Sequence, residues 1–155
     1  MPACSVRYNF NQHFAVPALD AYKWCTDYRS NDFRLMGLNG KRSIKPISAD
    51  AIILIDTISS DGKLITKKKL VRLDPNKFSW TNTHLAGPNK HSQFLYQITA
   101  EEERSSRLEF TGRQIDYGRQ KISQKEIAPL ARKYREEDSM IWKRLAKEME
   151  KDLLS

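Results

Sequence analysis

Apolar and polar residues alternate along several segments of the chain, as expected of β-strands that bury one face. Near the N-terminus, polar residues alternate with Cys4, Val6, Tyr8 and Phe10. A weak strand follows at 40–48, and Pro46 makes it an edge strand because proline has no backbone donor. Turn chemistry separates five stronger strands, which predicts an antiparallel meander. These strands cover 50–59, 63–73, 77–86, 91–100 and 106–117.

Two short helices are predicted between the first strand and the edge strand. Residues 16–28 have one apolar face, and Pro17 suits a first helical turn because its ring fixes φ near the helical value. Residues 30–37 add one or two turns, with Ser30 or Asn31 as the N-cap.

A long helix is predicted at the C-terminal end. Ser123 and Glu126 have the spacing of a capping box. Pro129 lies too deep for a first turn, so we expect a kink or a restart there and a continuous helix from about 130 to 153. One helical face carries an apolar stripe that contains a single carboxylate, Asp138. The stripe consists of Tyr134, Asp138, Ile141, Leu145 and Met149.

The turn lengths also predict which strand residues share a face. They pair Val71 with Trp80, Trp80 with Tyr96, and Tyr96 with Phe110. On this reading Trp80, Tyr96 and Phe110 point toward the last helix. The opposite face carries Thr81, Gln97 and Thr111 and meets water.

Toward one end the inner face becomes polar, through Asp56, Lys67, Lys69, Asn82 and His84. A carboxylate facing this end has to be paired, hydrated or protonated, so we expect Asp138 to reach one of these polar groups or a bridging water.

Composition adds limits to this picture. The chain has 155 residues and a formal net charge of +8. That length favours one domain, 1–155. No apolar run approaches the ~20 residues of a membrane-spanning helix, and the N-terminus lacks a signal-peptide pattern. Cys4 and Cys25 match no metal spacing, and no nucleophile motif or phosphate loop is present. We therefore expect no metal, no cofactor and a reducing, cytoplasmic location.

Three stretches resemble a known family: "FAVPALDAYKWCTDY", "VRLDPNKFSW" and "APLARKYREEDSMIWKRLAKEMEKDL". Together with the order of predicted elements, they resemble the START-type, or SRPBCC, superfamily, which includes polyketide cyclase-like and birch-pollen-allergen-like proteins. The resemblance implies an α+β helix-grip fold. In that fold a curved antiparallel sheet, here of about seven strands, wraps around the long helix and leaves a cavity. Members bind lipids, sterols or aromatic polyketides, and a minority catalyse cyclisation or dehydration.

The graded inner face and the helix stripe together define a candidate site for a small hydrophobic or amphipathic ligand, mostly apolar with a few converging polar groups. Its predicted lining is Leu54, Asp56, Lys67, Lys69, Trp80, Asn82, His84, Phe94, Tyr96, Phe110, Tyr134, Asp138 and Ile141. The leading hypothesis is binding without catalysis. The second is a cyclase or aromatase that uses His84, Asp56 or Asp138 as acid and base.

Each polar candidate also has an ordinary structural interpretation. Asp138 is solvated if a kink at Pro129 rotates the stripe, and His84 can be a solvated strand-end residue. Lys67 and Lys69 can extend their ammonium groups to water. The basic charge permits a third function, binding of nucleic acid or an anionic surface. The lack of a nucleic-acid motif disfavours it.

Overall fold

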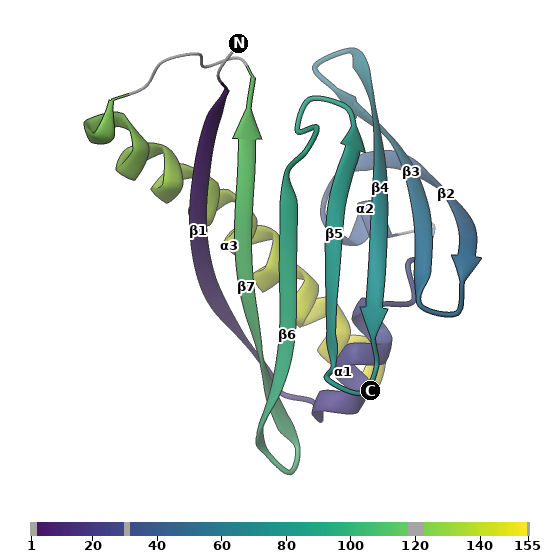
Figure 1. Ribbon diagram of the computed structural model, residues 1–155. Coiled ribbons are helices and arrows are strands. Elements are labelled where there is room, and N and C mark those ends of the chain that lie inside the picture. Colours follow the sequence, from purple (N-terminus) through teal and green to yellow (C-terminus); the bar gives the residue numbers. More distant parts are fainter. Residues whose placement is uncertain (1–2, 30–31, 118–122, 155) are drawn as a thin grey trace.

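The computed structural model describes residues 3–29, 32–117 and 123–154 (Figure 1). In chain order, its elements are β1 (Cys4–Phe14), α1 (Ala18–Cys25), α2 (Asp32–Leu35), β2 (Asn39–Ser48), β3 (Ala51–Ser60), β4 (Lys63–Asp74), β5 (Ser79–Ala86), β6 (Gln93–Glu102), β7 (Ser105–Asp116) and α3 (Gln124–Leu154). This is the order predicted from the sequence. The N-cap predicted for α2 at Ser30 or Asn31 lies outside the described residues.

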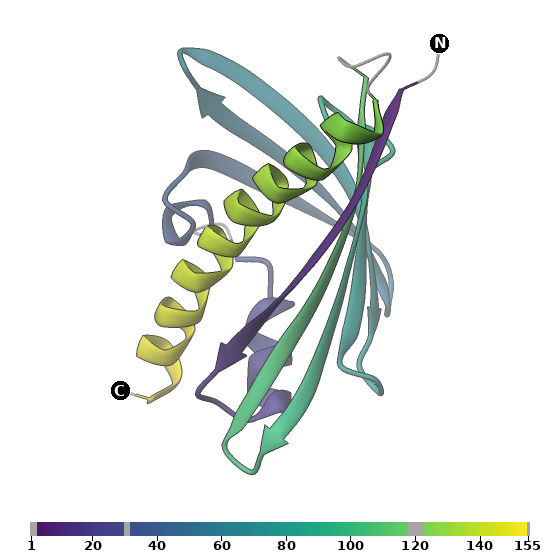
Figure 2. The ribbon, with the colours of Figure 1, turned by 90° about the vertical axis from the view of Figure 1, so that its left-hand side faces the viewer.

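The strands form one antiparallel sheet in the order β1-β7-β6-β5-β4-β3-β2, which confirms the predicted meander and places β2 at an edge. β1 closes the other edge by pairing with β7, from Cys4 opposite Asp116 to Phe14 opposite Ser106. Figure 2 shows α3 lying along one face of the curved sheet. The structure therefore has the helix-grip arrangement, with α1 following β1 and α2 following α1.

The restart that the sequence allowed at Pro129 was wrong, because α3 is one helix from Gln124 to Leu154 with Pro129 inside it. The predicted N-terminus at Ser123 is correct, and its carbonyl accepts from the backbone of Glu126 at 2.9 Å. Pro129 lacks only the donor that would reach the carbonyl of Lys125 in the first turns. The helix tolerates this loss so near its N-terminus, and the apolar stripe stays in phase with the sheet.

Strand registers agree with prediction at three of the interfaces and differ at one. Val71 faces Ile52, Trp80 faces Tyr96 and Tyr96 faces Phe110, as expected. Between β4 and β5 the predicted pairing was wrong, because Val71 faces Asn82 and not Trp80. The turn keeps its four-residue length but spans 75–78 instead of 74–77, with Phe78 in it at φ +49°. A shift of two residues keeps the side chains from Lys69 to Leu73 on their predicted faces, and an irregularity between Lys68 and Lys69 ends this register.

Because the β4–β5 register differs from the prediction by two residues, the side chains that face the helix are still the predicted ones. Trp80 and Phe110 are buried toward the helix, and Tyr96 is half-buried beside them. Thr81, Gln97 and Thr111 are half-buried on the opposite face. The fully buried core lies toward the C-terminal half of α3, where Phe14, Leu108 and Met149 are completely enclosed. At the other end of the sheet the inner face is polar, and this is where the candidate site lies.

No helix in the described part of the chain is long and apolar enough to cross a membrane.

Candidate functional site: a cavity between sheet and helix

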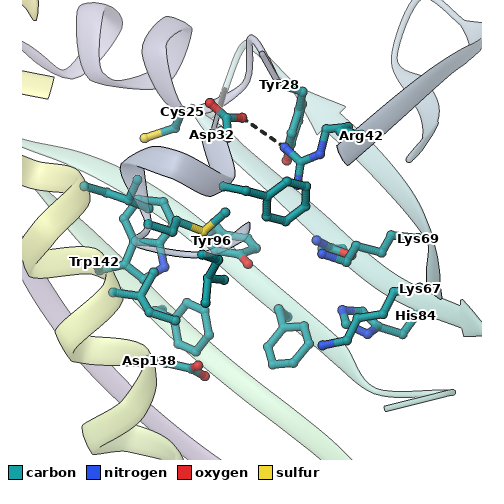
Figure 3. A pocket seen from close by; sticks show the side chains of 18 of the residues that line it. Cys25, Tyr28, Asp32, Arg42, Lys67, Lys69, His84, Tyr96, Asp138 and Trp142 are labelled. Atoms are coloured by element: carbon teal, nitrogen blue, oxygen red, sulfur yellow. Dashed lines mark hydrogen bonds and ion pairs between the residues drawn. The ribbon is translucent and has the colours of Figure 1, made fainter. Parts of the chain in front are cut away.

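A cavity of about 240 Å³ lies between the inner face of the sheet and α3, and α2 and the end of α1 contribute to its wall (Figure 3). A water molecule in the liquid occupies ~30 Å³, so the space suits a compact molecule of one or two rings. Pockets for small molecules commonly have volumes of ~300–1,000 Å³, which puts this cavity just below the usual range.

Aromatic side chains form one wall of the cavity. The rings of Trp80 and Tyr96 stack with centroids 4.6 Å apart and planes 3° from parallel. Phe110 meets Tyr96 edge to face at 5.2 Å, and Trp142 of α3 approaches Tyr96 at 5.8 Å. Together with Trp24, these residues place all three tryptophans of the chain on the cavity wall. The wall offers a stacking surface to a flat ligand, and its tryptophans can report binding through a change in their fluorescence.

A buried charge cluster borders the cavity on the side of β2, β3 and β4. Asp56 is completely buried and receives the guanidinium of Arg42 at 2.8 and 3.0 Å. The same carboxylate meets the ammonium of Lys69 at 2.8 Å. Arg42 also contacts Asp32 at 2.9 Å, and its guanidinium lies 4.8 Å from the centroid of Phe33. Charges buried this deeply need partners, and within this cluster they have them.

The cluster fixes the protonation of its members. Burial by itself would raise the pKa of Asp56, but the hydrogen bonds and charges of Arg42 and Lys69 hold that pKa below its ordinary value. For Asp32 burial dominates over the attraction of Arg42, and its pKa rises to about 6. Burial lowers the pKa of Lys69, and Asp56 opposes this. Asp56 is therefore the ionised centre of the cluster.

Asp138 of α3 points into the cavity, but its partner comes from an unexpected strand. The hydroxyl of Tyr8 in β1 donates to its carboxylate, and Gln114 donates to the Tyr8 oxygen at 3.2 Å. Gly112 makes this possible, because a Cβ there would lie 2.7 Å from the Tyr8 hydroxyl. Burial raises the pKa of Asp138 to about 6, although the bond from Tyr8 lowers it. The sequence predicts a partner from the polar end of β4 and β5 or a bridging water, whereas the hydrogen bond comes from Tyr8, and Lys69 is paired with Asp56.

Two buried polar side chains from β5 also line the cavity. Asn82 and His84 are 8% and 4% exposed. Their Oδ1 and Nδ1 atoms have no hydrogen-bond partner among the described residues. Burial and the nearby charges of Lys69 and Lys67 lower the pKa of His84 to about 3, so its ring is neutral at physiological pH. The usual cost of an unpaired buried polar group is ~1–3 kcal/mol.

Lys67 completes this end of the cavity. It is half-buried, and within the described ranges it makes no ion pair. Burial lowers its pKa, and the charges of Asp56 and Asp138 oppose the shift. Gly87 lies directly against the Lys67 stem, because a Cβ at Gly87 would be 3.2 Å from its Cγ. Figure 3 shows Lys67, Lys69 and His84 on one side of the cavity and Asp138 and Trp142 on the other.

Most residues of the predicted lining do surround this cavity: Lys67, Lys69, Trp80, Asn82, His84, Phe94, Tyr96, Phe110, Asp138 and Ile141. Three do not. Leu54 is completely buried in the core, and Asp56 lies behind Arg42 and Lys69. Tyr134 packs against the ring of Tyr8 and donates to Asp116 at 3.1 Å, beyond the cavity's end.

Sequence reasoning missed the contribution of the segment between β1 and β3. Cys25, Tyr28, Phe33, Met36 and Arg42 all line the cavity. Arg42 had a detectable signal, because it lies opposite Asp56 in the β2–β3 pairing and a buried acid requires a cation. The α1–α2 residues had none, because no periodic pattern tells where a short helix packs.

The comparisons with known proteins agree on the fold. No family model and no curated protein matches the chain. Among solved structures, the chain is similar to the Zhui aromatase/cyclase from a Streptomyces species, at 14% identity and a TM-score of 0.75, covering 95% of this chain and 94% of that one. A START superfamily protein from Mycobacterium smegmatis matches at 11% identity and 0.73, covering 94% and 97%.

Norcoclaurine synthase from Thalictrum flavum, solved in complex with dopamine and hydroxybenzaldehyde, matches at 11% identity and a TM-score of 0.68, covering 94% of this chain and 86% of that one. At such low identity these similarities establish the fold alone. The chain has the START-like, or SRPBCC, helix-grip fold, as its sequence indicated.

Proposed function

We propose that this protein binds a small amphipathic molecule with a flat apolar body in the cavity between the sheet and α3. The observation that carries the proposal is the combination of an aromatic wall with buried, unpartnered polar atoms on Asn82 and His84. If this region served stability alone, apolar side chains would fill it, because unpaired buried polar atoms cost free energy. A ligand with complementary polar groups removes that cost.

The structural neighbours support the size and character of this ligand. Norcoclaurine synthase was solved with two small aromatic molecules, and another neighbour is an aromatase/cyclase. A cavity of about 240 Å³ suits molecules of that scale. Fold alone does not select a ligand, so the proposal depends on the lining residues of this chain.

Narrowing the cavity tests the proposal. Ile141 lies on the cavity wall, whereas the preceding residue, Met140, is 70% exposed on the same helix. We expect wild-type protein and Met140→Phe to bind 2-naphthol, seen by calorimetry and by a change in tryptophan emission. Ile141→Phe should weaken this binding about tenfold or more while thermal unfolding shows that the fold is kept, because the added ring occupies ligand space. Equal binding by both variants would place the probe elsewhere and contradict the proposal.

One observation favours acid–base catalysis as a second function. Asp138 faces the cavity with a pKa of about 6, close to the value that suits proton transfer at neutral pH. His84, with its pKa of about 3, is a poor base by the same criterion. Catalysis of this kind would exchange the α-hydrogens of 2-tetralone for deuterium in heavy water, which NMR detects. No exchange above the buffer rate would leave binding as the function.

A further inference from the structure

The cations around the cavity differ in whether their charge is already matched. Arg42 is held by both Asp56 and Asp32, and Lys69 is held by Asp56. Lys67 lines the same cavity, and none of the described residues forms an ion pair with it. A half-buried ammonium without a carboxylate is costly, and residues 3–29, 32–117 and 123–154 supply none within ion-pair distance.

Neutral hydrogen-bonding atoms accompany Lys67 at this end. The register places Lys69 opposite His84, and Asn82 lies two residues away on the same face of β5. Asn82 Oδ1 is an acceptor that needs a donor, whereas the Nδ1 of a neutral histidine donates or accepts according to its tautomer. The lining at this end of the cavity thus includes one cation, one acceptor, and one ring nitrogen that can take either role.

The opposite wall sets the orientation of an occupant. Asp138 carries the negative group of that wall, and its hydrogen bond from Tyr8 is already made. A second anion beside Asp138 would be repelled, whereas one beside Lys67 would be attracted. The stacked rings of Trp80 and Tyr96 line the same cavity. An asymmetric ligand therefore has its apolar body on the rings and its negative group toward β4.

We propose, building on the binding function above, that the cavity selects an organic carboxylate with a flat apolar body, and that Lys67 is the residue that recognises the carboxylate. Lys67 neutralises the anion, and Asn82 accepts from a hydroxyl or amide hydrogen elsewhere on the ligand. The net charge of +8 on the chain favours the approach of such an anion.

Two nearly isosteric probes separate charge from shape. 2-Naphthoate and 2-naphthamide have the same rings and differ mainly in the charge of the terminal group. We expect calorimetry to show that the wild-type protein binds 2-naphthoate about tenfold or more tightly than 2-naphthamide, because hydrogen bonds to charged groups are the stronger ones. Equal affinities for the two probes would overturn the assignment of a carboxylate while leaving the binding function intact.

Two neighbouring lysines provide a matched pair of variants. Lys67→Met should abolish the preference for 2-naphthoate and leave 2-naphthamide binding within about threefold. Lys68→Met removes the same charge from the exposed outer face of β4 and should keep the preference. A preference that survives in Lys67→Met contradicts the role of Lys67. The wild-type comparison stands even if a variant does not fold, and failure of the wild type to bind either probe refutes the binding function itself.

Discussion

Two groups of residues beside the cavity have opposite character. The aromatic row, made of Trp80, Tyr96 and Phe110, stacks ring on ring and buries apolar surface. The charge cluster, made of Asp32, Arg42, Asp56 and Lys69, buries ionised groups that must satisfy one another. Burial of the aromatic row stabilises the fold directly, whereas a buried ion network often adds little net stability. The contrast indicates that the polar end is kept for something other than stability.

The largest loss of stability is expected when the charge cluster loses its central carboxylate, that of Asp56. Asp56→Asn leaves the charges of Arg42 and Lys69 without the carboxylate between them. Breaking a buried ion pair costs ~3–5 kcal/mol because the partner charge stays buried, and urea unfolding should show a loss of that order. Asp61→Asn, in the exposed turn between β3 and β4, is the control and should change little. A loss below about 1 kcal/mol for Asp56→Asn would mean that the cluster is hydrated.

The next effect depends on pH and concerns Asp138. Its pKa is about 6 in the folded protein against an ordinary value of 3.8. A raised pKa means that its contribution to stability is complete below about pH 4 and is lost as the pH rises through about 6. In Asp138→Asn the side chain cannot ionise, so the variant does not lose this stability as the pH rises. The variant should therefore gain on the order of 1–2 kcal/mol over the wild type at pH 7 and less at pH 4.

Unfolding in urea at several pH values measures the difference in unfolding free energy between Asp138→Asn and the wild type. Glu136→Gln is the matched control, because Glu136 is an acid on the same helix that is exposed to solvent. Its stability difference from the wild type should stay nearly constant from pH 4 to pH 7. A gap for Asp138→Asn that does not widen with pH would show that water reaches the carboxylate freely.

The smallest effect is expected at Asn82, on the boundary between the two groups. Asn82→Leu replaces an unpaired buried acceptor by an apolar group of similar size and should raise the free energy of unfolding by ~1 kcal/mol. The same change should weaken ligand binding. Thr81→Val, on the outer face of the same strand, controls for strand propensity. A loss of stability at Asn82 would mean that its amide is satisfied in the folded protein.

The success of the sequence prediction follows the same division. The aromatic row was predictable because side chains alternate with a period of two, and even the wrong β4–β5 register moved the pairing by two residues. The cavity-facing position of Asp138 was likewise predictable from the helical period. Both inferences need only local periodicity.

The partners within the site were not predictable to the same degree. Tyr8 reaches Asp138 because β1 closes the sheet against β7, a pairing between segments about a hundred residues apart. Arg42 comes from a strand with a weak pattern and an edge position. Polar partners depend on long-range registers and on single small residues such as Gly112, and neither leaves a periodic signal.

A crystal structure of the protein grown with 2-naphthoate tests the central claim most directly. We predict density for the rings inside the cavity, against the aromatic wall that Trp80, Tyr96 and Trp142 form, with the carboxylate within hydrogen-bonding distance of Lys67 Nζ. Density for the probe only on the outer face of the sheet, or an occupied cavity with the carboxylate turned toward Asp138, would contradict it.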